Sequence, residues 1–359
     1  MEEEVYRQLA ERLDALPNGF PPTQSGVEVR LLKHLFTMEE ARLACVMSLV
    51  PEASADIAGR VHGDPNEIRN TLKKMGAKGL IDIRKGDGQF GFALKPFVVG
   101  FYETQLPRMD AQMAVLFEQY YQETQGGIVR EVPSLHRVIP VGKAIPFQIE
   151  IHSYERASDL LERAQSWGVR SCICRKQQQL LGKGCGRPEE TCLVFAPVKN
   201  AFDRSAVDRA VTKEEALRIL RDTEEAGLVH TAGNYRDGID YICNCCTCCC
   251  GILRGIAEYG HLNAVARSDF RITVESDRCT GCGDCIERCQ FHALSVPDTS
   301  VAIEHIHCMG CGLCVAGCPT EALQLERRPA GEVPLTPADI NEWRTQRLEE
   351  RGRSRTDRR

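Results

Sequence analysis

Two runs of four cysteines stand close together near the C-terminal end, and both have the spacing C-x2-C-x2-C-x3-C. Each cysteine of the first run has a counterpart 29 residues later, and the flanking pair Ala293-Leu294 matches Ala322-Leu323 at the same offset. A fixed offset of this kind indicates the duplication of one structural unit. The first run is Cys279, Cys282, Cys285 and Cys289, and the second is Cys308, Cys311, Cys314 and Cys318.

The residue types and the gaps between them favour an iron–sulfur centre. Thiolates are soft ligands that suit iron bound to sulfide. Gaps of two residues in a tight loop let three sulfurs face one iron–sulfide cube, and the glycines in these gaps permit backbone conformations that other residues avoid. A zinc site is the alternative, but zinc takes four ligands in paired C-x2-C sets, whereas this pattern supplies two matching runs of four.

Residues 271–327 resemble the bacterial ferredoxin family that holds two [4Fe–4S] clusters. The resemblance implies that the fourth cysteine of each run ligates the cluster of the other run. One departure from the family is Gln290, which follows Cys289 where the family usually has proline; it removes no ligand. The implied ligands are Cys279, Cys282, Cys285 and Cys318 for cluster 1, and Cys308, Cys311, Cys314 and Cys289 for cluster 2.

Ten further cysteines lie in the middle of the chain, too many to be explained by packing alone. We expect them to converge on at least one more iron–sulfur cluster, with a structural zinc site or a redox-active thiol pair as alternatives. Arg175 follows Cys174 and either bonds to sulfide or an anion there, or is a solvated charge. Neighbouring cysteines generally point in different directions, so one cube does not easily use all of them. The ten are Cys172, Cys174, Cys185, Cys192, Cys243, Cys245, Cys246, Cys248, Cys249 and Cys250.

The composition supports metal ligation over disulfides. The N-terminus, Met1-Glu2-Glu3-Glu4, lacks the order of a signal peptide, so we expect a cytoplasmic protein whose 19 cysteines stay reduced. No apolar run approaches the roughly 20 residues that a membrane span needs. With 45 basic and 50 acidic residues, a net charge of −5 argues against a large nucleic-acid interface.

Residues 25–100 have the pattern of helices and strands that is typical of a winged helix-turn-helix. Thr37 and Glu40 form a capping box that opens one helix, and Asp64 with Pro65 opens another that runs to about Lys78. Alternating apolar residues over 80–84 and 89–94 predict a hairpin around Lys85-Gly86-Asp87-Gly88, which would be the wing. Residues 1–100 have 13 basic and 14 acidic side chains, so DNA binding is possible but a protein-docking, dimerising or structural role is favoured.

The remaining segments complete a predicted α+β protein with an N-terminal winged-helix-like domain, a cysteine-rich middle domain and a C-terminal two-cluster ferredoxin fold. Helices are expected over 107–124 and 154–168 and from the capping box at Thr212 to Ala226, and an extended connector over 128–150. No partner can be named from the sequence for His152, His230 or His261. The predicted domains are 1–125, 126–268 and 269–328, followed by a polar tail over 329–359.

Most of the chain also resembles a family of 4Fe–4S binding proteins from anaerobic microbes, with an N-terminal winged-helix-like domain. The resemblance implies cluster binding and no particular reaction. The segments that carry it are Pro140-Val141-Gly142-Lys143, Ser171-Cys172-Ile173-Cys174-Arg175, Leu181-Gly182-Lys183-Gly184-Cys185 and Ile242-Cys243-Asn244-Cys245-Cys246-Thr247-Cys248-Cys249-Cys250.

These patterns leave two classes of function. The sequence has no P-loop, dinucleotide-binding glycine motif or nucleophile elbow, so an electron carrier or oxidoreductase subunit is favoured over a stand-alone enzyme. It would relay electrons through two [4Fe–4S] clusters to a further cluster or to a redox partner protein. The alternative is a redox- or oxygen-sensing transcriptional regulator that uses the winged helix. Both classes of function are compatible with a homodimer.

Overall fold

The computed structural model describes residues 2–86, 89–145, 152, 154–329, 331–332 and 335–352. The chain forms two compact units of mixed helices and sheets, which are described separately. The first unit comprises Met1–Glu131, Gln177–Lys183 and Arg344–Arg359, and the second comprises Val132–Lys176 and Gly184–Trp343. Among the described residues, no helix is both long and apolar enough to cross a lipid bilayer.

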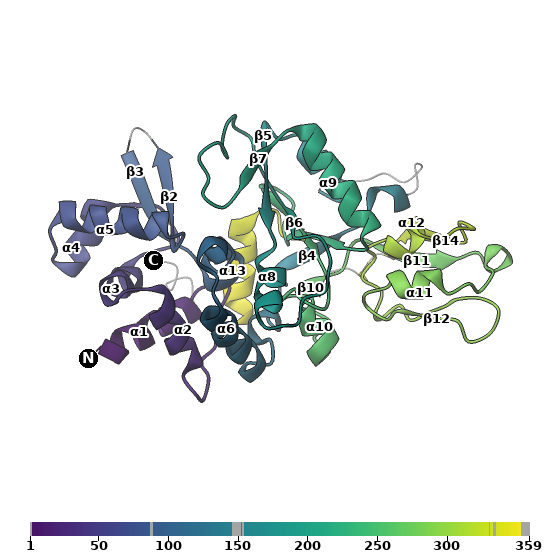
Figure 1. Ribbon diagram of the computed structural model, residues 1–359, viewed down its shortest axis with the longest axis horizontal. Coiled ribbons are helices and arrows are strands. Elements are labelled where there is room, and N and C mark those ends of the chain that lie inside the picture. The colour runs from purple at the N-terminus through teal and green to yellow at the C-terminus, as the bar shows by residue number, and fades with distance from the viewer. Residues whose placement is uncertain are drawn as a thin grey trace. The chain divides into compact units, whose positions relative to one another are not determined.

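The first unit contains short helices and a three-stranded sheet of order β1-β3-β2 (Figure 1). The capping box of Thr37 and Glu40 is confirmed at the start of α3, and Asp64 caps α5 by accepting the N–H groups of Asn66 and Glu67. The predicted hairpin is β2 and β3, although residues 87 and 88 of its turn lie outside the described residues. The elements are α1 (Glu2–Asp14), α2 (Val27–Leu35), α3 (Met38–Val46), β1 (Glu52–Ala53), α4 (Ser54–Val61), α5 (Pro65–Ala77), β2 (Ile81–Gly86), β3 (Gln89–Leu94), η1 (Phe97–Phe101), η2 (Glu103–Arg108), α6 (Ala111–Glu123) and η3 (Gly127–Val129).

An aromatic core holds the first unit together. The Phe97 ring lies 4.9 Å from the Phe20 ring, and Phe117 stacks on Tyr102 with ring centroids 4.2 Å apart. The segment predicted as a polar tail contains a helix, α13 (Ile340–Glu350). Arg347, which is completely buried, donates hydrogen bonds to carbonyl oxygens of the first unit, among them Pro17 O at 2.8 Å.

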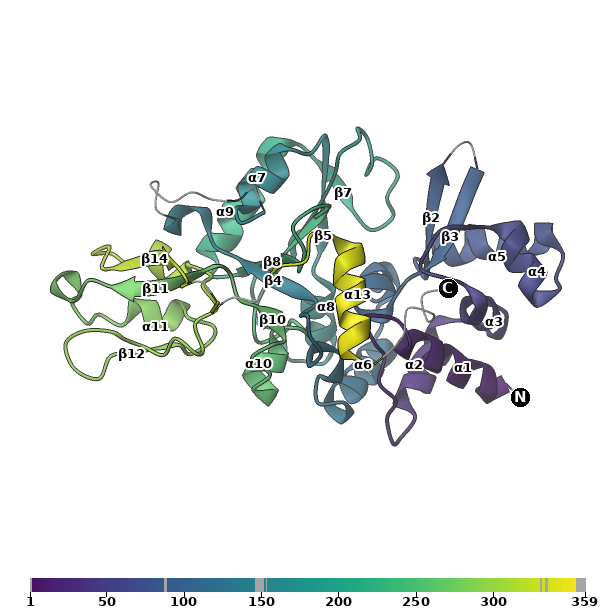
Figure 2. The ribbon, with the colours of Figure 1, turned by 180° about the vertical axis from the view of Figure 1, so that it is seen from behind.

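The second unit is built around a seven-stranded sheet of order β10-β4-β8-β9-β6-β5-β7. All neighbours in it are antiparallel except β10 and β4. Helix α9 packs against β5, β6 and α7 (Figure 2). The elements are β4 (His136–Ile139), η4 (Gly142–Ala144), α7 (Ala157–Glu162), β5 (Ser166–Ser171), α8 (Ile173–Leu180), β6 (Glu190–Ala196), β7 (Arg209–Val211), α9 (Lys213–Glu225), β8 (Val229–Gly233), β9 (Tyr241–Cys245), α10 (Arg254–Tyr259) and β10 (Val265–Ala266).

Two predicted segments of this unit need correction. The expected helix over 154–168 is only α7, and Trp167 belongs to β5, where it pairs with Phe195 of β6. The expected connector over 128–150 contains β4, a strand buried between β10 and β8, while residues 146–150 lie outside the described residues. Strand β4 was hidden because polar residues interrupt its apolar pattern: His136 and Arg137 are buried with polar partners.

The C-terminal module, residues 269–328, belongs to the second unit (Figures 1 and 2). Strand β11 pairs with β14 in antiparallel fashion, which joins the beginning and the end of the module. Each cysteine run passes into a short helix, and the two helices are packed together. The elements are β11 (Phe270–Val274), η5 (Ser276–Arg278), α11 (Asp284–Arg288), β12 (Leu294–Ser295), β13 (Ala302–Ile303), α12 (Leu313–Ala316) and β14 (Leu323–Arg327).

Candidate metal centres

The first three cysteines of run one and the last cysteine of run two line a single cavity. Thr280, Pro319 and Leu323 are among its other walls. Burial raises the pKa of Cys285, and the negative charges of the three other thiols of the group, when ionised, raise it further. The two runs are therefore interleaved in space. The four cysteines of this cavity are Cys279, Cys282, Cys285 and Cys318.

The remaining four cysteines of the module form a second group. Cys308, Cys311 and Cys314 are buried, and Cys289 is partly exposed. Burial raises the pKa of Cys311 to about 12, with further contributions from Cys289 and Cys308. These thiols are close enough to repel one another when ionised, which a bound cationic centre would reverse.

The fourth cysteine of each run is held in the same way in both halves of the duplication. The backbone N–H of Ala293 donates to Cys289 Sγ at 3.4 Å, and that of Ala322 donates to Cys318 Sγ at 3.3 Å. Such hydrogen bonds stabilise a thiolate and tune the cluster that it ligates.

Glycines shape the two loops for a bulky group. Gly281 and Gly310 occupy equivalent places in the duplication, and both have positive φ angles, of 66° and 69°. A Cβ atom at Gly281 would lie 2.9 Å from Thr299 O, and one at Gly310 would overlap Phe270 O. The loops thus bring the backbone close to the cysteines without side chains in between. Eight thiols, a cavity among four of them and this backbone geometry fit two [4Fe–4S] clusters.

The two groups differ in exposure. Cys282 of the first group is exposed, whereas the loop of the second group packs against η4 and the residues just before it, after strand β4. The backbone N–H of Val141 donates to Cys311 O at 2.9 Å. A Cβ atom at Gly312 would meet Ala144 Cβ at 2.6 Å, while at the equivalent Gly283 it would meet nothing within 4 Å.

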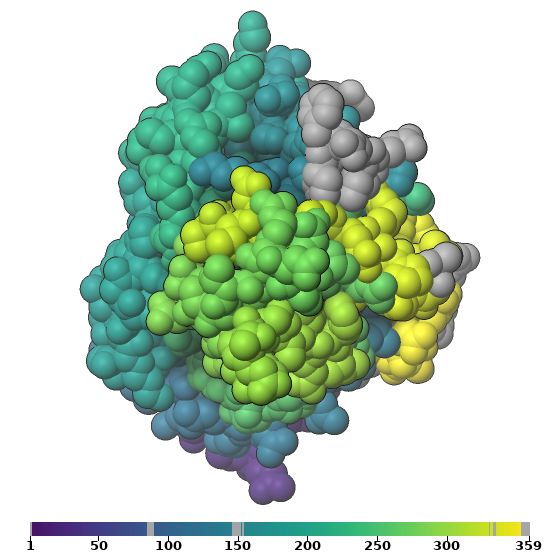
Figure 3. All heavy atoms as spheres, turned by 90° about the vertical axis from the view of Figure 1, so that its right-hand side faces the viewer, coloured from purple at the N-terminus to yellow at the C-terminus, as the bar shows by residue number. Residues whose placement is uncertain are grey.

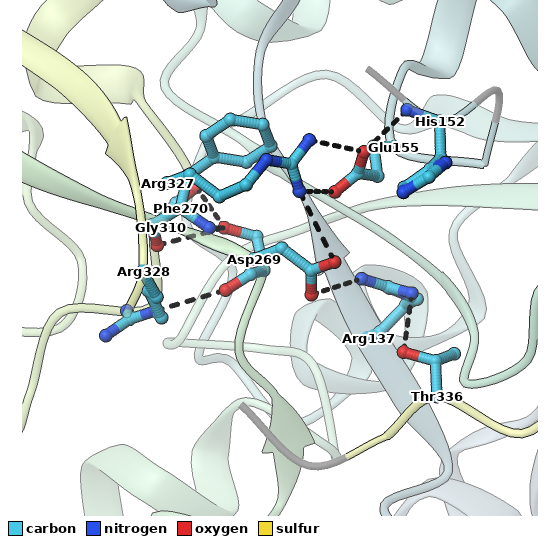
Figure 4. A network of polar contacts seen from close by, with 10 residues as sticks. Arg137, His152, Glu155, Asp269, Phe270, Gly310, Arg327, Arg328 and Thr336 are labelled. Atoms are coloured by element: carbon cyan, nitrogen blue, oxygen red, sulfur yellow. Dashed lines mark hydrogen bonds and ion pairs between the residues drawn. The ribbon is translucent and has the colours of Figure 1, made fainter. Parts of the chain in front are cut away.

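A network of ion pairs attaches the strands of the module to the sheet (Figure 4). Arg137 of β4, whose side chain is 2% exposed, pairs with Asp269 at 3.2 Å. At the end of β14, Arg327 pairs with Glu155 at 2.9 Å, and Arg328 donates to Cys308 O at 2.6 Å. The carbonyl of a cysteine in the second group is therefore fixed by the same network.

Six of the middle cysteines form a closed ring of thiols. They come from the β5–α8 junction, β6, β9 and the turn after β9, and the ionisation of each thiol is influenced by two neighbouring thiols of the ring. Hydrogen bonds from Cys174 and Cys192 lower the pKa of Cys172, whereas the pKa values of the other five are raised. Without a bound metal, the ring therefore favours one ionised thiol, Cys172, and disfavours ionisation of the other five. Around the ring the order is Cys172, Cys174, Cys250, Cys245, Cys243 and Cys192.

The other four middle cysteines form a separate and tighter group. Their Sγ atoms all lie within 4.8 Å of one another, so they could hold one metal ion. Cys245 and Cys246 are adjacent but belong to different groups, and so do Cys249 and Cys250. The tight group is Cys185, Cys246, Cys248 and Cys249.

Arg175 lies between the two middle groups and is not a solvated charge. Its side chain is buried, and it donates to Asn244 O at 3.1 Å and to Cys246 Sγ at 3.7 Å. It also donates to the Thr191 hydroxyl. Its charge acts to lower the pKa values of both Cys172 and Cys246, so one guanidinium stabilises a thiolate in each group.

Sequence reasoning missed a buried polar cluster beside these cysteines. His230 is fully buried, with Nδ1 2.5 Å from Asn244 Oδ1 and Nε2 3.2 Å from Glu224 Oε1. Asn244 in turn donates from Nδ2 to Thr191 O at 2.5 Å. The one available signal was the position of Asn244 between Cys243 and Cys245; the two partners of His230 lie on α9 and β9, and only the pairing of β8 with β9 and the packing of α9 bring them to it.

Gln290 connects the module to the middle cysteines. Its Oε1 accepts the backbone N–H of Thr247 at 2.8 Å, and its Nε2 donates to Gly227 O and, at 3.4 Å, to Cys245 O. The residue that departs from the ferredoxin pattern thus has a role that proline could not fill.

Comparison with known proteins identifies the C-terminal module alone. The 4Fe-4S dicluster domain family matches residues 278–322, which contain both cysteine runs. Searches of curated proteins and of solved structures found no match. The chain therefore carries a ferredoxin-type 4Fe–4S domain near its C-terminal end, together with a cysteine-rich region.

Proposed function

We propose that this protein is an iron–sulfur electron-transfer protein, in which the eight cysteines of the C-terminal module hold two [4Fe–4S] clusters as interleaved quartets. When bound, such clusters accept and release single electrons. The observation that carries the proposal is the cavity in which Cys318 of the second run joins Cys279, Cys282 and Cys285 of the first.

The difference in exposure supports a direction for the relay. The quartet around Cys282 is the exposed one, and we place the docking site of a redox partner protein there. Figure 3 looks onto the module, whose residues are drawn in light green to yellow. The quartet around Cys311 is the more buried one and contacts the segment that follows β4, and Gln290 joins the module to the middle cysteines.

The ring of six thiols supports a further iron–sulfur cluster in the middle region. Its six sulfurs are drawn from segments distant in sequence, which a packing role does not require. Arg175 and the backbone around Asn244 hold the strands that present them. Hydrogen bonds from such outer groups orient the ligands and tune the bound centre.

A regulator that uses a winged helix is the second candidate. The element order α3-β1-α4-α5-β2-β3 with sheet order β1-β3-β2 supports a winged-helix domain. On α5, Arg69, Lys73 and Lys74 are exposed, but Lys78 is engaged by the buried Glu40 at 2.6 Å. A docking or dimerising role of this domain in a cytoplasmic electron carrier therefore remains our preferred proposal.

The proposal is tested on protein purified without oxygen. Two clusters require about eight iron and about eight acid-labile sulfide atoms per chain, and a third cluster raises both numbers. Reversible reduction, followed by electron paramagnetic resonance, should show interacting paramagnetic centres. A colourless protein without labile sulfide after reconstitution would refute the proposal, and sequence-dependent DNA binding that changes with oxidation state would favour the regulator.

A further inference from the structure

We propose that Cys185, Cys246, Cys248 and Cys249 hold a single tetrahedral metal ion, Zn²⁺ or Fe²⁺, distinct from every iron–sulfur cluster of the protein. This site is independent of the electron-transfer role proposed above. It divides the ten middle cysteines into a group of four and a ring of six, each with its own occupant.

The spacing of the four sulfurs sets the size of the occupant. Four thiolates around one ion at about 2.3 Å lie roughly 3.8 Å apart, and no two of them can be more than about 4.6 Å apart. The largest separation in the group is within 4.8 Å, and Cys248 Sγ lies 3.8 Å from Cys249 Sγ. A cube distributes its four ligands over four different iron atoms, which forces the sulfurs further apart. The group therefore has the dimensions of a site for one ion.

The backbone builds this site locally. After β9 the chain turns, with the N–H groups of Cys249 and Cys250 directed at Cys246 O, at 3.4 Å and 3.0 Å. This turn places three of the sulfurs on one side, and Cys185 adds the fourth from the loop after α8. Leu228, which is fully buried, packs against Cys246 and Cys249 and closes the inner side.

Positively charged side chains next to the four cysteines balance the negative charge that remains when one divalent ion is bound. Four thiolates and one divalent ion carry a net charge of −2. Two arginines donate to two different sulfurs of the group: Arg175 Nη1 to Cys246 at 3.7 Å and Arg187 Nη1 to Cys248 at 3.5 Å. Two positive charges therefore face two excess negative ones, and both arginines act as outer-shell donors.

The ligand set specifies the class of ion. Tetrahedral coordination by four thiolates selects zinc or iron among the common ions of the cell. All four positions are filled by protein, as in closed structural sites, so no position remains open for a substrate. The site thus stabilises the turn after β9, which also presents Cys250 to the ring.

Metal and sulfide analysis of the full-length protein tests this proposal. The variants Cys185→Ser and Cys248→Ser alter the two less buried members of the group. Each should lose one zinc or iron atom per chain while the acid-labile sulfide content stays at the wild-type value, because a single-ion site contains no sulfide. The matched control Cys45→Ser, which changes a cysteine outside all groups, should lose neither. Elemental analysis also distinguishes zinc from iron.

Three results would overturn the proposal. The first is a loss of several iron atoms together with sulfide in Cys185→Ser, which would indicate a cluster. The second is an unchanged metal content in a folded variant. If the variants do not fold, spectroscopy on the wild type decides: X-ray absorption for zinc should give four sulfurs at about 2.3 Å, and Mössbauer spectra for iron should give one tetrahedral ferrous site. The third result is wild-type protein that shows neither the zinc–sulfur signal nor the tetrahedral ferrous signal.

Discussion

The side-chain oxygen of Gln290 accepts the backbone N–H of Thr247 at 2.8 Å, so the residue after Cys289 is bonded to the residue between Cys246 and Cys248. This contact joins the second quartet of the module to the tight group of four thiols. In a ferredoxin the equivalent position usually carries proline, whose side chain can make no such bond. We infer that glutamine is needed here because the module does not act alone.

Replacement of Gln290 by leucine should therefore destabilise the protein without removing a ligand. The N–H of Thr247 and the carbonyl of Gly227 would lose their partner, and because both groups are half-buried the loss should cost about 1 kcal/mol each, below the roughly 1–3 kcal/mol of fully buried groups. Thermal unfolding of the metal-loaded variant should show the lower midpoint. Gln324→Leu, at an exposed position of the same module, is the control and should change stability by less than about 0.5 kcal/mol.

The interleaved quartets predict which cluster each cysteine supports. Cys282→Ser and Cys311→Ser should each disturb one cluster and lower the iron content from about eight towards about four atoms in the module. The magnetic interaction between reduced centres should vanish in both variants. Retention of full iron in both would contradict the ligand assignment.

Two equivalent glycines of the duplication should respond differently to alanine. Gly283 and Gly312 both have positive φ angles, 86° and 74°, so alanine costs about 1–2 kcal/mol of backbone strain at either position. Only at Gly312 does the new methyl group meet Ala144, which adds about 1–3 kcal/mol for overpacking. Unfolding midpoints should thus fall further for Gly312→Ala, and equal effects would show that the loop of the second group is not packed on η4 as described.

Arg175→Lys should weaken metal binding at the tight group. Lysine keeps the charge, but its single ammonium cannot reproduce the guanidinium bonds to Asn244 O, Thr191 and Cys246 together. Competition with a coloured chelator should show an affinity lower by about 10- to 100-fold, the usual effect of losing an outer-shell partner. Arg187→Lys, near the surface, should have the smaller effect; the reverse order would contradict this role of Arg175.

The buried His136 predicts a specific pH dependence of stability. Burial lowers the pKa of His136 to about 3, whereas an unfolded histidine titrates near 6.5. Above about pH 6.5 the ring is neutral in both states, so its contribution is fully present. As the pH falls, only the unfolded chain takes up the proton, and stability should decline by about 1.4 kcal/mol per pH unit.

Unfolding of wild type and His136→Gln between about pH 7 and about pH 5.5 measures this effect, since the metal sites are common to both proteins. As the pH falls, the wild type should lose more stability than His136→Gln, because only the wild type has a ring that takes up a proton on unfolding. His305→Gln, at an exposed position, should run parallel to the wild type. A constant difference for His136→Gln would show that the ring is accessible to protons.

Local signals in the sequence were sufficient to predict where several helices begin. The caps at Thr37, Asp64 and Thr212 each begin a helix, because a side chain accepting a nearby N–H depends only on neighbouring residues. The seven-stranded sheet was not predicted, since its strands are short and buried polar residues such as Arg137 obscure their alternation.

The candidate sites likewise divide into a part that local sequence signals predict and a part that depends on the three-dimensional fold. The eight cysteines of the module could be located from spacing and duplication alone. The division of the middle cysteines could not, because it depends on how β5, β6 and β9 are paired and on the turn after β9. Spacing also gave no indication that Arg175 would be buried between the groups, or that Glu224 would meet His230.

The alternation of Cys245, Cys246, Cys249 and Cys250 between two groups has a consequence for biogenesis. One short stretch of backbone serves two sets of sulfurs, so filling either set restrains the other before its own occupant arrives. In the arrangement proposed above, the order in which the two groups are filled would therefore matter, and the insertion or deletion of one residue within the stretch would displace ligands of both groups at once.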